Sequence, residues 1–95
     1  MRRIKRSKNF KRDIKKLERS GKYSEAMKKR FEPALNALMN DEPLNSSYYD
    51  HQLIGSMQGA RECHILFDIV LVYWLVGDDV LYLDRLNTHS EALRL

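Results

Sequence analysis

Residues 69–76 read IVLVYWLV, the most apolar run of the chain. Its β-branched, aromatic and leucine side chains are typical of a central β-strand that is covered on both faces. Gly77-Asp78-Asp79 follows and supplies a tight hairpin turn. Residues 80–86, VLYLDRL, are then predicted to form the last strand. The centre of the predicted sheet is therefore this hairpin.

The stretch before this run, residues 59–67, alternates as a strand with two distinct faces does. One face is predicted to carry Arg61, Cys63, Ile65 and Phe67, and the other Glu62, His64 and Leu66. A short first strand is predicted within residues 1–6. After the last strand, Thr88 and Glu91 match a capping box, so a short terminal helix is predicted to begin at His89.

Two amphipathic helices are predicted between the first strand and residue 40. Ser7 is the expected N-cap of the first helix, which ends near Ser20-Gly21, and the second begins near Ser24. Apolar residues recur three or four positions apart in each. The first stripe is Phe10, Ile14 and Leu17, and the second is Met27, Phe31, Leu35 and Leu38.

Pro33 interrupts the second stripe, because proline removes a helical hydrogen bond and clashes with the preceding turn. The sequence favours a kink there, or a break into a short turn and a main helix that begins near Phe31. Residues 40–49, NDEPLNSSYY, are turn residues throughout and predict a loop.

These elements predict an α+β fold in the order β-α-α-β-β-β-α. Two N-terminal helices pack on one face of a mostly antiparallel, four-stranded, twisted sheet, and the other face stays partly open and concave. At 95 residues the chain is expected to be one domain, residues 1–95.

The composition predicts a soluble cytoplasmic protein. No stretch approaches the roughly 20 apolar residues of a membrane helix, and the charged N-terminus lacks the apolar segment of a secretory signal. The one cysteine, Cys63, excludes an internal disulfide and a Cys-rich metal site. It is predicted to be a core residue on the helix-covered face.

Charge divides the chain into two parts of opposite sign. Residues 1–30 hold 14 Lys and Arg against three acids, and residues 31–95 hold three basic residues against ten acids. A basic block of this density indicates a polyanionic partner, most often nucleic acid. The alternative is a solvated helix face whose charge keeps the protein soluble.

All three histidines lie around the sheet, in the segment 50–68 and just after the last strand. His51, His64 and His89, with Asp68 four residues after His64, would bring three imidazoles and a carboxylate together. Imidazole exchanges protons near neutral pH, so two such groups can cleave RNA without a metal: one removes the 2′-hydroxyl proton and the other protonates the leaving 5′-oxygen.

A nearby arginine would stabilise the developing phosphoryl charge, and Arg61 and Arg85 are the arginines of the sheet region. Two alternatives remain at this point. Each histidine can be purely structural, or the three can bind zinc with the aspartate. The histidines lie 13 and 25 residues apart with no pair at i, i+4, which argues against zinc.

Four features follow one another along the chain: DHQLIGSMQGARECH (residues 50–64), Asp68, YWL and DRLNTH. Together they resemble the YafQ branch of the RelE/ParE toxin superfamily. These are small bacterial toxins of type II toxin–antitoxin pairs. The resemblance is clearest over residues 49–93, and the first segment is its most specific part. It implies a ribosome-dependent endonuclease that cuts mRNA in the ribosomal A site without a metal or other cofactor.

The resemblance also implies the site residues. The catalytic cluster of the family falls on His51, His64, Asp68 and His89, with the general base and acid shared among the imidazoles. Arg61 and Arg85 match arginines expected to contact phosphate. Where the family pattern has an aromatic residue able to hold a base, this chain has Leu93.

The implied partners are the ribosome with its mRNA, and an antitoxin similar to DinJ. That antitoxin would combine an acidic wrapping segment with a ribbon-helix-helix domain, so operator DNA is reached only through it, and no membrane is involved. Apart from the resemblance, the basic first helix is suited to bind ribosomal RNA, since Lys and Arg give salt-sensitive affinity for phosphate. Its contact residues are predicted to be Lys11, Lys15, Lys16 and Arg19.

Two other functions remain open. A ParE-like inhibitor of DNA gyrase would have no use for three clustered histidines. An RNA-binding module without cleavage would leave the histidines structural.

Overall fold

The apolar run forms β4 (Ile69–Val76), the central strand of a five-stranded sheet. The computed structural model of the protein describes residues 1–93. The strand order is β1-β5-β4-β3-β2, with β1 (Arg3–Arg6), β5 (Val80–Thr88), β3 (Arg61–Leu66) and β2 (His51–Gln52). The first five residues of β4 are all buried, so the prediction of a strand covered on both faces is confirmed for residues 69–73, whereas Leu75 and Val76 at its end are exposed.

The α+β class and the mostly antiparallel sheet are confirmed, because among the strands of residues 1–93 β1 alone pairs in parallel, with β5. The predicted number of four strands is one too low. His51 and Gln52 pair with the start of β3 and add a two-residue edge strand between the predicted loop 40–49 and the predicted strand 59–67. Phe67 also departs from its predicted place. The register shifts between His64 and Leu66, β3 ends at Leu66, and Phe67 lies fully exposed in the turn.

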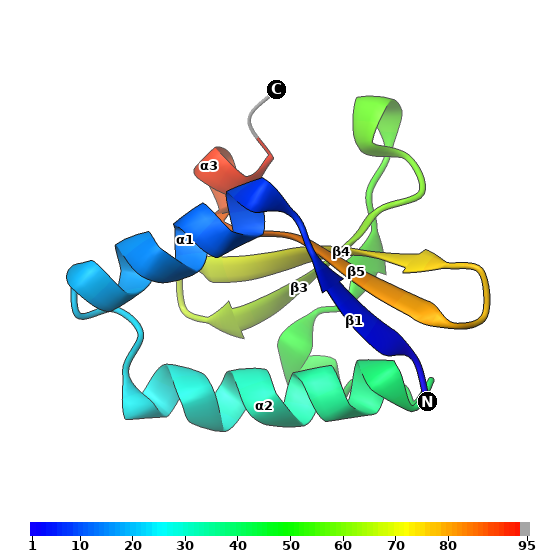
Figure 1. Ribbon diagram of the computed structural model, residues 1–95, viewed down its shortest axis with the longest axis horizontal. Helices are drawn as coiled ribbons and strands as arrows, with labels where there is room; N and C mark the ends of the chain where they lie inside the picture. Colours follow the sequence, from blue (N-terminus) through cyan, green and yellow to red (C-terminus); the bar gives the residue numbers. More distant parts are fainter. Residues whose placement is uncertain (94–95) are drawn as a thin grey trace.

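The two predicted helices are α1 (Lys8–Arg19) and α2 (Glu25–Met39), and Figure 1 shows them bordering the strands. Ser7 and Ser24 cap them by accepting backbone N–H bonds. Helix α1 packs against β5 and α2 against β3. Their apolar stripes and the inward side chains of β3, β4 and β5 form one core.

Helix α2 does not break at Pro33 but runs continuously through it. Pro33 is exposed, whereas Met27, Phe31, Ala34 and Leu38 are buried on both sides of it. On the exposed side, water can bond the carbonyl group that proline leaves unpaired. Packing of the continuous stripe therefore outweighs the local cost of the proline.

The sheet face opposite these helices is partly covered. Helix α3 (His89–Ala92), capped by Thr88 as predicted, and the segment 53–60 both lie on it. They pack on side chains of β4, including Trp74. Gly59 has φ +103°, and a Cβ there would lie 3.0 Å from the Trp74 ring, so the close approach requires glycine. No helix within residues 1–93 is long and apolar enough to span a membrane.

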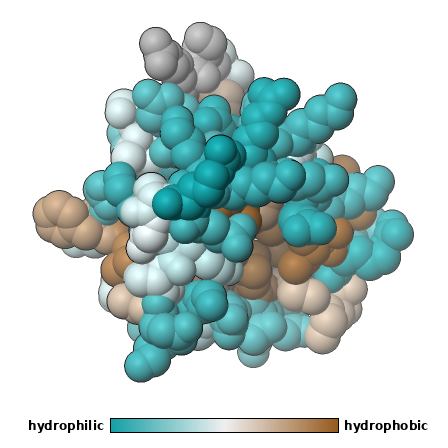
Figure 2. Space-filling view, turned by 60° about the vertical axis from the view of Figure 1, so that its left-hand side comes forward, coloured by the Kyte–Doolittle hydropathy of each residue, from teal (hydrophilic) through white to brown (hydrophobic). Residues whose placement is uncertain are grey.

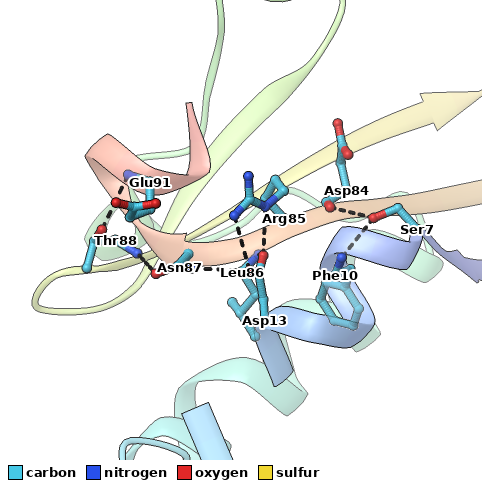
Figure 3. Close-up of polar contacts among 9 residues, drawn as sticks. All are labelled: Ser7, Phe10, Asp13, Asp84, Arg85, Leu86, Asn87, Thr88 and Glu91. Carbon is cyan, nitrogen blue, oxygen red and sulfur yellow. Dashed lines mark hydrogen bonds and ion pairs between the residues drawn. The ribbon is translucent and has the colours of Figure 1, made fainter. Parts of the chain in front are cut away.

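Asp13 joins α1 to the part of β5 that β1 does not reach. Strand β1 pairs with Val80–Leu83 only, so the backbone beyond Leu83 has no strand on that edge. Figure 3 shows Asp13 there: its carboxylate accepts bonds from the Leu86 N–H at 2.9 Å and from the Arg85 guanidinium at 2.8 and 3.1 Å. The Asn87 amide adds a fourth bond. A side chain thus replaces the missing strand.

Replacing Asp13 with alanine should lower the free energy of unfolding by about 3 kcal/mol, because it leaves the partly buried Arg85 guanidinium and a buried N–H unpaired. Denaturant unfolding would measure this. Glu18→Ala, which removes an exposed acid from the same helix, is the matched control and should change the stability little. Equal effects of the two substitutions would contradict this role of Asp13.

Candidate active site

The three histidines converge on a buried carboxylate, that of Glu62. One Glu62 oxygen, Oε1, lies 3.3 Å from His51 Nε2 and 3.7 Å from His64 Nε2. The other, Oε2, lies 2.9 Å from His89 Nδ1. The Glu62 side chain is 1% exposed, whereas those of His51, His64 and His89 are 47%, 38% and 62% exposed. We call these four residues the histidine cluster.

Sheet register explains the convergence. His51 on β2 is the direct antiparallel partner of Glu62 on β3, so their side chains share one face. His64 lies two residues further along β3 and points the same way. His89 begins α3 immediately after β5 ends at Thr88, which pairs with Ile69. Elements that are distant in the chain thus deliver one imidazole each.

Glu62 is an unsatisfied buried group within residues 1–93. Although three imidazoles lie within ion-pair range, neither carboxylate oxygen has a hydrogen bond of good geometry. Burying a carboxylate costs several kcal/mol unless positive charge or hydrogen bonds compensate for it. The three imidazoles are placed to supply both, which ties the orientation of each ring to Glu62.

His51 is held from both sides. Its Nδ1 lies 2.6 Å from the carbonyl oxygen of Tyr49. A carbonyl can only accept, so Nδ1 carries the proton and donates it. Nε2 then points at Glu62. This bond fixes the rotation of the ring and presents its other nitrogen to the cluster.

A second polar group on the helix-covered face of β3 anchors the chain just before His51. Asp50 accepts a bond from Arg61 Nη2 at 3.0 Å and one from the Tyr73 hydroxyl at 2.5 Å, and Arg61 Nε also donates to that hydroxyl. The bond to Asp50 raises the pKa of Arg61, and burial raises the pKa of Tyr73 well above its usual range. Both groups therefore keep their protons, and Asp50 stays fixed.

The structure does not bring the other predicted site residues to the imidazoles. Arg61 lies on the opposite face of β3, bound to Asp50, and Arg85 is bound by Asp13, which raises the pKa of its guanidinium. Asp68 is exposed in the β3–β4 turn, where no interaction with another described residue is seen. Leu93 is half-buried and packs against the apolar cluster beneath α3.

Cys63 is fully buried among core residues, as predicted. Burial raises the pKa of its thiol far above the usual value, so it is not a nucleophile. Among the described residues, no group of three or more His, Cys, Asp or Glu side chains is arranged to hold a metal ion. The ring nitrogens of the three histidines face the two Glu62 oxygens.

Sequence reasoning missed Glu62, although it placed this residue on the same strand face as His64. The available signal was a carboxylate in the strand beside the most apolar run. Charged residues are rarely fully buried without partners, and a buried glutamate therefore marks a site.

The basic residues predicted to bind nucleic acid are on the surface. Lys11, Lys15, Lys16 and Arg19 are all exposed on α1. None of them forms an ion pair with an acid in the part of the chain that the structure describes, so their charge is available to a partner. The molecule therefore combines a cluster suited to proton transfer with a separate basic helix.

Comparison with protein families matches residues 2–94 to a model described as a bacterial toxin of type II toxin–antitoxin systems, YafQ. A putative toxin YafQ from Haemophilus influenzae is 44% identical over 62 residues, which cover 62% of this chain and 61% of that relative. The mRNA interferase toxin YafQ from Escherichia coli K12 is 33% identical over 84 residues, which cover 78% of this chain and 90% of the relative.

Solved structures share the whole fold. A copper-bound mutant toxin from Helicobacter pylori superposes with a TM-score of 0.84 at 38% identity, covering 96% of this chain and 98% of that one. The toxin in a DinJ–YafQ complex from E. coli gives a TM-score of 0.80 at 29% identity, covering 98% and 99% of the two chains.

Proposed function

The chain belongs to the YafQ family of type II toxin–antitoxin toxins, and we propose that it is an mRNA interferase, an endoribonuclease that cleaves mRNA in the A site of the ribosome. The observation that carries this proposal is the convergence of three half-exposed imidazoles on buried Glu62. The name of the E. coli relative supports the reaction class.

In the proposed reaction two of the imidazoles act on opposite sides of one phosphodiester. The neutral imidazole takes the proton of the 2′-hydroxyl, whose oxygen attacks phosphorus and forms a 2′,3′-cyclic phosphate. The protonated imidazole gives its proton to the departing 5′-oxygen, which leaves as a hydroxyl. Glu62 contacts no substrate in this scheme; it orients the rings and stabilises the positive charge that each acquires in turn.

In this scheme the imidazolium group stabilises the negative charge that develops on the phosphoryl oxygens in the transition state. Arg61 and Arg85 were predicted for this role, but both guanidinium groups bind carboxylates in the folded chain. We propose instead that both arginines position the site. Arg61 holds the segment that carries His51, and Arg85 holds the end of β5. Asp68 remains a candidate for orienting an imidazole once RNA is bound, because its carboxylate is exposed.

We propose that the reaction needs no metal. The H. pylori relative has been seen with copper bound, but the donor groups within residues 1–93 of this chain do not surround a common ion position. Every proton transfer of the scheme is supplied by side chains of the cluster.

Primer extension on a translated reporter mRNA tests the function. Purified protein should cut at in-frame codon positions only when ribosomes are present, and a chelator that spares the ribosomal magnesium should leave the cuts unchanged. His64→Ala or His89→Ala should lower the cleavage rate by about 100-fold or more, since general acid–base catalysis contributes about 10²–10⁴-fold. Both histidines are partly exposed, and each variant keeps the other two imidazoles beside Glu62, so the variants should fold.

Asp68→Asn in the same assay separates the role of Asp68 from that of the histidines.

Cuts on naked RNA would make the protein a free ribonuclease, and full cleavage by both histidine variants would exclude this cluster as the catalyst. No cuts under any condition would favour the binding or gyrase functions.

We further propose that α1 binds ribosomal RNA through Lys11, Lys15, Lys16 and Arg19, because their exposed charges lack acidic partners among the described residues. Phosphate contacts of this kind release counterions, and the affinity then falls steeply with salt.

Lys15→Glu with Lys16→Glu should therefore weaken ribosome association and flatten its salt dependence, as measured by co-sedimentation over a series of salt concentrations. Lys28→Glu with Lys29→Glu on α2 changes the net charge equally and is the matched control. Equal weakening by the two pairs would show that total charge, and not α1, governs binding.

An antitoxin is the second proposed partner, as the DinJ–YafQ complex supports. A groove of about 470 Å³ lies between β1, α1 and α2, and its walls include Ile4, Phe10, Ile14, Tyr23 and Leu35. Strand β1 beside it is an edge strand, so its outer N–H and C=O groups can pair with an added strand. Figure 2 shows such hydrophobic hollows bordered by hydrophilic side chains on this side of the molecule.

Most residues that line this groove, Arg6 among them, belong to the segment 1–30, which holds 14 basic residues against three acids. We therefore propose that an extended antitoxin segment with apolar anchors and acidic flanks occupies it. Ile4→Lys should weaken the complex with the cognate antitoxin about tenfold or more, because it places a charge among the apolar walls. Ile54→Lys, at an isoleucine that is 89% exposed in a loop away from the groove, is the control for isothermal titration. Unchanged affinity of the Ile4 variant would exclude the groove.

A further inference from the structure

We propose that Tyr49 is the platform on which a base of the bound mRNA stacks next to the catalytic imidazoles. The proposal deepens the function above and rests on it. Tyr49 is 71% exposed, although large aromatic side chains are usually buried. Its ring meets that of His64 edge-on, with the centroids 5.7 Å apart at 63°. Its backbone carbonyl holds His51. One residue therefore contacts two of the three imidazoles.

The backbone turns the Tyr49 ring away from the core. Tyr49 has φ +49° and ψ +43°, the left-handed conformation, which is uncommon for a tyrosine. It directly follows the short 3-10 helix η1 (Ser46–Tyr48), capped by the side chain of Asn45. The neighbouring ring, Tyr48, is buried. Two adjacent tyrosines thus point in different directions, one into the core and one to solvent.

This segment is fastened to the framework of the site by Arg30 of α2. The Arg30 guanidinium lies 3.8 Å over the Tyr48 ring and donates to the carbonyl groups of His64 and Ile65 on β3. It also bonds Ser47, while the Tyr48 hydroxyl donates to the Arg30 carbonyl. The same side chain therefore fixes both the strand that carries His64 and the segment that carries Tyr49. The contacts of Arg30 therefore keep the exposed Tyr49 ring beside the His64 imidazole.

Leu93 does not offer such a platform. It is the residue that the family resemblance matches to a base-holding aromatic, and here it is aliphatic and packs half-buried against the apolar cluster beneath α3. Phe67 is another exposed aromatic, at 100%, but it lies in the β3–β4 turn with no ring contact to a histidine. Among the described residues, Tyr49 is the aromatic ring in contact with the cluster.

Stacking on one face of Tyr49 would hold a base of the A-site codon while the sugar and phosphate reach the imidazoles. Every base has a π-face, so such a platform tolerates sequence variation and contributes mainly to affinity and alignment. Tyr49→Phe keeps this face, whereas Tyr49→Ala and Tyr49→Leu remove it; the leucine also keeps apolar volume. Phe67→Ala is the control for the loss of an exposed aromatic elsewhere.

The test measures single-turnover cleavage on programmed ribosomes over a range of protein concentrations. We expect Tyr49→Phe within about twofold of the wild type, and Tyr49→Ala and Tyr49→Leu to need about tenfold more protein for half-maximal rate, the size that one base–aromatic stack supports. Phe67→Ala should match the wild type. Wild-type efficiency of the alanine or leucine variant, or an equal loss in Tyr49→Phe, would overturn the proposal.

Binding to ribosomes carrying an mRNA with a 2′-deoxy nucleotide at the cut site gives a readout that does not need cleavage. We expect the same order of affinities there. Tyr49→Phe should bind as tightly as the wild type, and Tyr49→Ala and Tyr49→Leu should bind more weakly. If the wild type fails to cleave but this order holds, the stacking role stands and the proposed function is wrong. If the wild type cleaves and all variants bind equally, the function stands and the stacking role is wrong.

Discussion

A carboxylate buried beneath three imidazoles is the constraint on which the site depends. Glu62 is buried, and no described group satisfies its oxygens with good hydrogen-bond geometry. Leaving such a group without compensation would cost several kcal/mol in a domain of marginal stability. The fold compensates by bringing one imidazole each from β2, β3 and α3 to the Glu62 carboxylate. The stability of the protein and the geometry of its proposed chemistry therefore rest on the same contacts.

Both faces of β3 contribute to this arrangement. Glu62 and His64 lie on one face of β3 and belong to the histidine cluster. Arg61 lies on the helix-covered face and binds Asp50, the residue before His51. Arg30 reaches from α2 to the end of the same strand. The helices therefore act on the site through the polar groups that fix the ends of β3 and the chain leading into β2. Asp13 does the equivalent for β5, from which His89 follows.

The elements that follow from local chemistry could be predicted from the sequence. The strand at residues 69–76, the caps at Ser7, Ser24 and Thr88, and the opposite faces of Cys63 and His64 all arise from side chains within a few positions. Long-range partners could not be predicted. The sequence cannot show that Arg85 binds Asp13, 72 residues earlier, or that a two-residue strand pairs His51 with Glu62. Alternation placed Glu62 correctly but could not show that this face would be covered.

The most direct test of this account is to replace Glu62 with glutamine and to record the imidazole nitrogen signals by NMR together with the cleavage rate. The substitution keeps the size of the side chain and removes its charge. We predict that the signals of His51, His64 and His89 all shift and that cleavage falls about 100-fold or more, while the backbone spectrum keeps the pattern of a folded protein. Unchanged histidine signals with cleavage near the wild-type rate would contradict the central role of Glu62.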